Sequence, residues 1–154
     1  MLALRLGLAA FAIYAFYRAG LAHGSRYLDR QRQLRELRSS LRALETEVVY
    51  GRTPLPLACE RLAAVDTGSG ACLFAALGRR LAAATSARQA WLGALDEVLP
   101  RLALDEEDGS VLVSLASCLG QSDPADQSAH LEMVRGMLAE RERLAAQEAQ
   151  KNGR

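Results

Sequence analysis

A leucine-rich helical pattern that stops abruptly constrains this chain more than any other feature of its sequence. Leu34, Leu37, Leu41 and Leu44 recur at steps of three and four, the spacing of one face of a helix. The pattern ends at "YGRTP" over residues 50–54, where a glycine and a proline stand close together. Such residues end one helix and begin another. Because so short a joint makes neighbouring helices antiparallel, the sequence predicts a helical hairpin.

Each residue of this corner has a predicted part in it. We expect Gly51 to adopt the left-handed conformation that closes a helix, with Tyr50 packing back on the last turn. Thr53 is expected to cap the next helix, and Pro54 to lie in its first turn, where its fixed φ and missing amide hydrogen are harmless.

Composition predicts that the remainder is also helical. The 154 residues are 50% hydrophobic but only 5% aromatic, and there are four prolines. This is typical of one all-α domain, large enough for a real core. We expect an antiparallel bundle of about six helices within a domain at 24–150, with the helices near 25–49, 54–64, 71–84, 86–99, 106–119 and 124–150.

Two features of the predicted bundle have alternative interpretations. The leucine seam of the first helix fits packing inside the chain's own bundle, or a coiled coil between two copies. Trp91, the only tryptophan, fits a core anchor, or a platform on which a ligand stacks. In the last helix Leu131, Val134 and Leu138 form a seam that continues as Arg141/Glu142 and Ala145. Beyond residue 140 the helix is so charged that we expect it to project.

The N-terminus is an apolar segment between two arginines. Residues 6–17 carry no charge, and the stretch from Leu2 to Ala22 is about 32 Å long as a helix, close to the thickness of a bilayer core. We predict an uncleaved transmembrane anchor at residues 1–23; a cleaved signal peptide and a buried core helix are the alternatives. Five arginines soon after the segment place the following domain in the cytoplasm by the positive-inside bias: Arg26, Arg30, Arg32, Arg35 and Arg38.

Several functional classes are disfavoured. The net charge of +1 does not recommend nucleic acid as a partner. Cys59, Cys72 and Cys118 form no CxxC pair, so we expect buried, reduced thiols and no metal site. The loop "DTGSG" at 66–70 lacks the context of a phosphate-binding loop, and the acidic run at 105–108 suits a helix N-terminus better than calcium. No catalytic constellation stands out, so we expect no enzyme, cofactor or small-molecule substrate.

Two stretches of the chain resemble the stage III sporulation protein AB family. The first, at 32–58, is "RQLRELRSSLRALETEVVYGRTPLPLA", and the second, at 119–138, is "LGQSDPADQSAHLEMVRGML". Trp91 also fits the single tryptophan of family members. The residues that carry the resemblance or the helical seam beside it are Gln33, Leu34, Leu37, Leu41, Leu44, Glu45, Glu47, Tyr50, Gly51, Thr53, Pro54, Leu55, Trp91, Leu119, Gly120, Asp123 and Gln127.

The resemblance implies a fold, a location and partners. The fold would be similar to the cytoplasmic domain of the platform protein of type II secretion and type IV pilus systems. The protein would help to build the channel complex between mother cell and forespore, in the mother-cell membrane around the forespore. Its partners would be other subunits of that complex, including one that resembles a secretion ATPase, and a second copy of itself is also open. Residues 151–154 would be a tail without the family's second transmembrane helix.

A charged face on the first helix is the candidate partner surface. Arg35, Arg38 and Arg42 lie on the side opposite the leucine seam, and we expect them to contact an acidic partner or simply to be solvated. The functional alternative is an exported helical bundle, released by signal cleavage, that binds a ligand or protein in the cell envelope.

Overall fold

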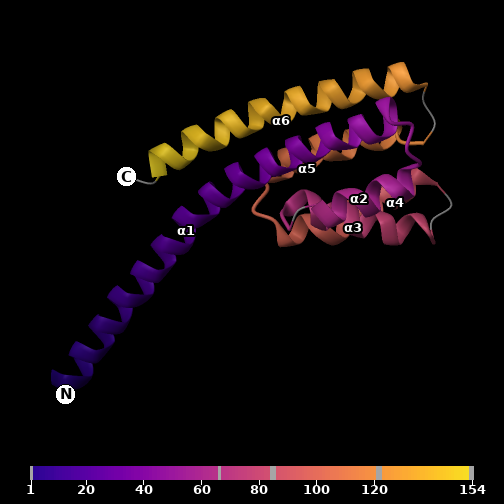
Figure 1. Ribbon diagram of the computed structural model, residues 1–154. Coiled ribbons are helices and arrows are strands. Elements are labelled where there is room, and N and C mark those ends of the chain that lie inside the picture. Colours follow the sequence, from indigo (N-terminus) through magenta and orange to yellow (C-terminus); the bar gives the residue numbers. More distant parts are fainter. Residues whose placement is uncertain (1, 66, 84–85, 121–122, 153–154) are drawn as a thin grey trace.

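Six α-helices joined by short turns make up residues 2–65, 67–83, 86–120 and 123–152, which this computed structural model describes (Figure 1). Side chains of the first helix are described at 8–19 and from residue 24 onward. The helices are α1 (Leu2–Glu45), α2 (Leu55–Val65), α3 (Ser69–Leu81), α4 (Ala87–Val98), α5 (Glu106–Val113) and α6 (Pro124–Asn152). A π-helical turn (Thr46–Tyr50) extends α1, and short 3-10 turns follow α4 (Leu99–Arg101) and α5 (Ser114–Ser117).

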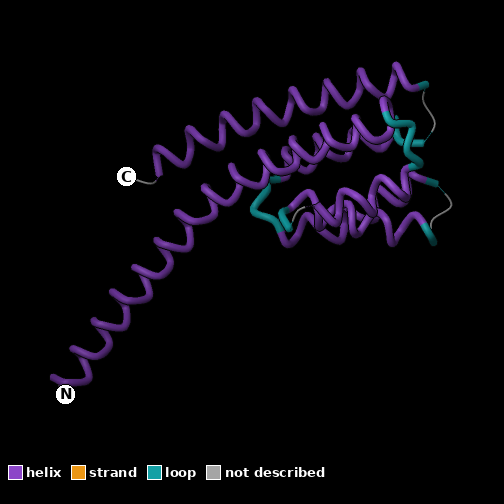
Figure 2. Tube along the Cα trace, viewed as in Figure 1, coloured by secondary structure: helices purple, strands orange, loops and turns teal. Residues whose placement is uncertain are grey.

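The two long helices run antiparallel along one side of the bundle. α6 lies along the second half of α1, and α2, α3 and α4 form the opposite side (Figure 1). The loops gather at the two ends of the bundle, and no strand occurs in the part of the chain that is described (Figure 2). The predicted all-α fold of about six helices is confirmed.

One core joins all six helices. The leucine seam of α1 is at most 1% exposed, so it packs within its own chain and not against a second copy. Trp91 is fully buried and donates its indole N–H to the Leu112 carbonyl oxygen at 2.8 Å, as expected of a core anchor. The largest fully buried side chains are Trp91, Phe74, Leu34, Leu37, Leu41, Leu44, Leu73, Leu77, Leu95, Leu112, Leu115 and Leu138.

The N-terminal half of α1 leaves the bundle as a lone helix (Figure 1). The predicted start of a separate helix near Ser25 is wrong, because α1 continues without interruption from Leu2 to Glu45. Residues 8–19 are all exposed, which contradicts the buried-core alternative; Phe11 is 69% and Phe16 81% exposed. The rest of the predicted anchor, residues 1–7 and 20–23, lies outside the described side chains.

The predicted transmembrane helix is not found. Within the residues described, none of the helices combines the length and the apolar character needed to cross a bilayer.

The corner after α1 has the predicted place but a different local geometry. Gly51 has an ordinary right-handed φ of −80°, and Arg52 takes the positive φ, at 51°. A glycine is required at position 51 because the chain passes close to the last turn of the preceding helix: a Cβ there would lie 2.8 Å from the Glu47 carbonyl oxygen. Tyr50 does not pack back, because it is 74% exposed. The Thr53 hydroxyl donates to the Glu47 carboxylate at 2.8 Å instead of capping α2.

The last helix does not project beyond residue 140 as predicted. Glu142 and Ala145 are buried, and Glu148 accepts a hydrogen bond from Arg30 of α1 at 2.6 Å. The charge of α6 does not mean exposure throughout, because Arg135, Glu142 and Glu148 pair with α1, and Arg141 pairs with the start of α5. The predicted tail at 151–154 is described only to Asn152, the last residue of α6, and its residues 153–154 lie outside the described part.

The third helix begins two residues earlier than predicted. Ser69 and Gly70 belong to its first turn rather than to a loop, and both are buried. The Glu36 carboxylate of α1 accepts hydrogen bonds from the Ser69 amide at 2.9 Å and from its hydroxyl at 2.8 Å. The negative carboxylate also interacts favourably with the positive, N-terminal end of the α3 dipole. A side chain of α1 therefore caps α3.

We expect Gly70→Ala to lower the free energy of unfolding by about 1–3 kcal/mol, the usual cost of forcing extra atoms into a packed contact. A Cβ at Gly70 would overlap the Ser40 side chain, and would lie 2.5 Å from its Cβ. In the background of Ser40→Gly, which removes that side chain, the same change should cost much less. Urea unfolding followed by circular dichroism measures both.

A matched control for this prediction is Gly136→Ala on α6. A Cβ there meets nothing within 4 Å, so alanine should leave stability unchanged or raise it slightly, by about 0.5–1 kcal/mol. Equal effects of Gly70→Ala in both Ser40 backgrounds would show that the contact with α1 is not the cause.

Candidate functional site

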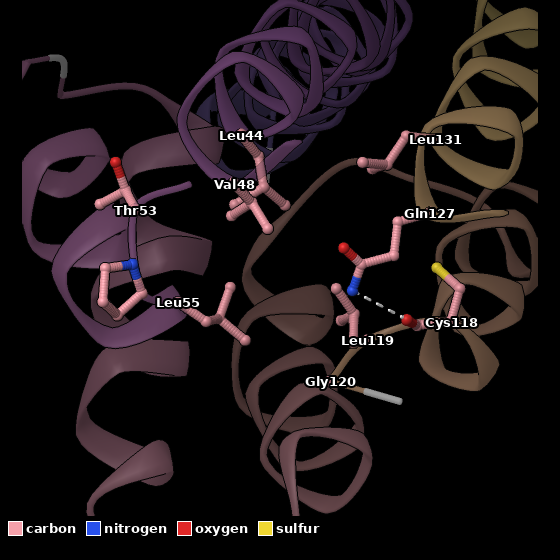
Figure 3. A pocket seen from close by; sticks show the side chains of 10 residues that line it. Leu44, Val48, Thr53, Leu55, Cys118, Leu119, Gly120, Gln127 and Leu131 are labelled. Atoms are coloured by element: carbon pink, nitrogen blue, oxygen red, sulfur yellow. Dashed lines mark hydrogen bonds between the residues drawn. The ribbon is translucent and has the colours of Figure 1, made fainter. Parts of the chain in front are cut away.

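An apolar hollow lies at the end of the bundle where the corner after α1 meets the segment before α6. Its volume is about 250 Å³ (Figure 3). The two stretches that carry the family resemblance, far apart in sequence, both contribute to its wall. The lining residues are Leu44, Val48, Thr53, Pro54, Leu55, Cys118, Leu119, Gly120, Gln127 and Leu131.

The chemistry of the hollow suits an apolar group. Leucine and valine side chains point into it, and the polar contact drawn in Figure 3 runs from Gln127 Nε2 to the Cys118 carbonyl oxygen at 3.4 Å. Burial raises the pKa of the Cys118 thiol, so it stays protonated and is a poor nucleophile at neutral pH. The volume is below the roughly 300–1,000 Å³ of common small-molecule sites.

Hydrogen bonds around Glu47 hold the corner in place. Its carboxylate accepts from the Thr53 hydroxyl and, at 2.9 Å, from Arg61 of α2. These bonds, first that of Thr53 and then that of Arg61, lower the pKa of the Glu47 carboxyl. Gly120, on the opposite wall, has a φ of +80° that a residue with a side chain rarely adopts. The wall of the hollow is therefore fixed by residues of both motifs.

Glu45 ties α1 to α6 next to the hollow. It is 7% exposed and accepts hydrogen bonds from Ser128 and Arg135, each at 2.6 Å. Asp123, another residue of the motifs, is exposed, and its main-chain carbonyl oxygen accepts from the Gln127 amide at 2.9 Å. α6 begins at Pro124, as predicted.

A second cluster joins α1, α5 and α6 at the other end of the bundle. Asp108 is fully buried and bonds Arg30 at 2.7 and 3.1 Å and Arg141 at 2.6 Å. Its carboxylate also accepts from the Asp105 amide, completing a capping box at the start of α5. Arg141 further bonds Asp105 and Glu107. The acidic run at 105–108 thus serves the helix N-terminus, as expected, and also a buried ion-pair network.

The predicted partner face is only partly free. Arg35 and Arg38 both bind Glu142 of α6, at 2.9 and 3.2 Å, whereas Arg42 is exposed and has no ion pair within the described residues. The three arginines border a separate hollow that also includes Ser39 and Arg135.

Most of the other predicted residues lie away from both hollows. Gln33 accepts a hydrogen bond from the Ala103 amide at 2.7 Å, and Trp91 lies in the core. Cys59 and Cys118 are buried as expected, but Cys72 is exposed, which corrects the expectation for that thiol. Burial raises the pKa of Cys59 to about 12. Within the described residues, groups of three or more His, Cys, Asp or Glu side chains placed to hold a metal ion do not occur.

The ion pairs of Arg30 and Arg141 with Asp108 were not predicted from the sequence. Asp105 and Asp108 have the three-residue spacing of a capping box, which could have indicated that both lie at a helix start. Nothing in the sequence indicates that Arg30 and Arg141 would converge on Asp108. Arg135 follows the seam residue Val134, but its position beside α1 depends on how the two helices pack.

The fold defines an all-α bundle protein organised on one long helix, with an exposed apolar end and a hollow walled by two sequence motifs. The model of the stage III sporulation protein AB family matches residues 5–154. Stage III sporulation protein AB of Bacillus subtilis (strain 168) is 33% identical over 145 residues, which cover 94% of this chain and 85% of that protein. A solved structure of stage III sporulation protein AB is similar with a TM-score of 0.74 and 32% identity, over 79% of this chain and 97% of that one.

The chain belongs to the stage III sporulation protein AB family. Membership confirms the family inferred from the corner and the second motif, and it supports a role in sporulation.

Proposed function

We propose that this protein is a non-enzymatic structural subunit of a secretion-like channel complex that links mother cell and forespore. It is attached to the mother-cell membrane, with the bundle in the cytoplasm. Other subunits of the complex, one resembling a secretion ATPase, are its proposed partners. The family's role in sporulation supports the proposal.

The observation that carries the proposal is the separation of two kinds of surface. Residues 8–19 expose Phe11, Phe16 and other large apolar side chains on a lone helix, whereas the second half of α1 is packed into a bundle with ordered charge pairs (Figure 1). An exposed apolar patch of this kind marks a membrane or a protein interface. Tyr14 and Tyr17, also exposed, have the amphipathic rings that favour the membrane surface.

An in-frame deletion of the gene, complemented by variants, tests this proposal. Heat-resistant spores should become rare in the deletion strain and return with the intact copy. The double variant Phe11→Asp/Phe16→Asp should fail to restore them and should move from the membrane fraction to the soluble fraction, because charged side chains are costly in a bilayer.

The matched control is Phe11→Leu/Phe16→Leu, which keeps both positions apolar and should restore spores and membrane attachment. Unchanged spore counts in the deletion strain would remove the proposed role. Normal counts with the aspartate variant in the soluble fraction would remove the membrane attachment while leaving the role in sporulation.

A further inference from the structure

Four arginines from two helices surround one hollow on the long side of the bundle. Arg35, Arg38 and Arg42 come from α1, Arg135 comes from α6, and the Ser39 side chain lies among them. The hollow measures about 370 Å³. The side chains of Arg35 and Arg38 are 62% and 40% exposed, so their guanidinium groups can be reached from solvent.

The arginines outnumber the carboxylates that bind them. Among the described residues, Glu142 pairs with Arg35 and Arg38, and Glu45 pairs with Arg135. Both carboxylates are largely buried, with side chains 12% and 9% exposed, so they lie behind the arginines. The hollow therefore presents a surplus of two positive charges to solvent.

The hollow also has hydrogen-bond donors without acceptors. Arg42 forms no ion pair with any described residue, and Arg135 bonds Glu45 through Nη2 while its buried Nε has no partner. An anion placed between α1 and α6 would give these donors an acceptor. Guanidinium groups match planar carboxylates particularly well, because each can donate two parallel hydrogen bonds.

We propose that this arginine hollow binds carboxylate side chains of an acidic segment on a partner protein. The inference rests on the proposed function, since it supplies the chemistry by which another subunit would recognise this one. The site extends the predicted one-helix face: Arg42 and Arg135 are its main contributors, and Arg35 and Arg38 stay partly engaged with Glu142.

Position and lining favour a protein carboxylate over other anions. Arg35 lies sixteen residues beyond Ala19, about 24 Å along α1, so a lipid headgroup near the apolar segment would not reach it. Sites for free phosphate typically use main-chain amides at a helix N-terminus. Every lining residue here stands inside a helix, where main-chain amides are already bonded.

The test measures binding of a fluorescein-labelled hexaglutamate peptide to the full chain by fluorescence anisotropy. Arg42→Glu should weaken binding by about tenfold or more, since reversing an interface charge replaces attraction with repulsion. Arg42→Lys should keep most of the affinity. The matched control is Arg88→Glu on α4, an exposed arginine with no ion pair among the described residues, and it should have little effect. Hexaglutamine should not bind.

The same variants in the complemented deletion strain connect binding to the assembly. Arg42→Glu should lower the heat-resistant spore count, and Arg88→Glu should not. If the deletion abolishes spores but Arg42→Glu restores them fully, the docking proposal is overturned and the proposed function stands. Equal loss of peptide binding in both charge-reversal variants would also overturn it.

Further measurements distinguish the proposed acidic segment from two other occupants of the hollow, a free anion and a second copy of the chain. If inorganic phosphate at constant ionic strength displaces the peptide at low millimolar concentration, the hollow is a free-anion site. If the intact protein self-associates in sedimentation velocity and Arg42→Glu makes it monomeric, the occupant is a second copy. Either result contradicts the assignment to an acidic partner segment.

Discussion

Asp108→Asn is expected to lower the free energy of unfolding by about 3–5 kcal/mol, the usual cost of breaking a buried ion pair. The substitution keeps the shape of the side chain but removes the charge that compensates Arg30, which is only 6% exposed. Because Arg30, Asp108 and Arg141 belong to three different helices, the loss weakens the packing of α1, α5 and α6 together. Urea unfolding followed by far-ultraviolet circular dichroism measures the change.

The pH dependence of this effect has a definite sign. Burial raises the pKa of Asp108, but hydrogen bonds from Arg30 and Arg141 outweigh burial and hold the pKa below its ordinary value. A lowered pKa gives stability that is fully present above the unfolded pKa of about 3.9 and is lost as the pH falls through the folded pKa. The difference in the free energy of unfolding between the unchanged protein and Asp108→Asn should therefore be constant from pH 7 to about pH 5 and shrink below about pH 4.

Asp96→Asn, an exposed change of the same kind on α4, is the control and should alter stability little at any of these pH values. A loss below about 1 kcal/mol in Asp108→Asn, within the range of surface ion pairs, would mean that Arg30 finds other partners and that the network is not essential.

Trp91→Ala should lower the free energy of unfolding by about 3–5 kcal/mol, as expected when a buried aromatic side chain is truncated and leaves a cavity. Trp91 is 0% exposed and lies where α4 meets α5. Trp91→Phe keeps most of the packing and removes one of the two donors to the Leu112 carbonyl oxygen, since the Ser114 amide also bonds it, so a smaller loss of about 0.5–1.5 kcal/mol is expected. Both are measured by the same unfolding experiment.

Tyr50→Ala is the matched comparison, since Tyr50 belongs to the first motif but is exposed. It should change stability by less than about 0.5 kcal/mol, as is usual for surface positions. If Trp91→Ala and Tyr50→Ala had similar effects, the core position of Trp91 would be contradicted.

Periodicity and turn residues allowed much of the fold to be predicted. The leucine seam of α1, the corner at 50–54 and the start of α6 at Pro124 follow from local patterns. Boundaries were less accurate where a long-range contact decides the outcome. α3 starts at Ser69 because Glu36, far away in sequence, caps it.

The candidate site could be predicted only in part. Thr53, Pro54 and Gln127 carry the resemblance, but their meeting around one hollow depends on how α6 lies against the corner. Glu142 is expected on the seam of the last helix and Glu148 on its projecting part, but nothing in the sequence shows that both bind arginines of α1. A charged helix face looks the same in sequence whether water or a complementary helix covers it, and only the packing distinguishes the two.

Because α1 is one continuous helix, the direction in which Phe11 and Phe16 point is fixed relative to the leucine seam. Each residue inserted between them would turn one end relative to the other by about 100° and move it by about 1.5 Å, as follows from 3.6 residues per turn. A change of about eighteen residues, five full turns, would restore the orientation and alter only the reach. The distance of the apolar end from the bundle and the direction in which its side chains point are therefore coupled. A small insertion in α1 rotates the apolar end instead of only lengthening the connection.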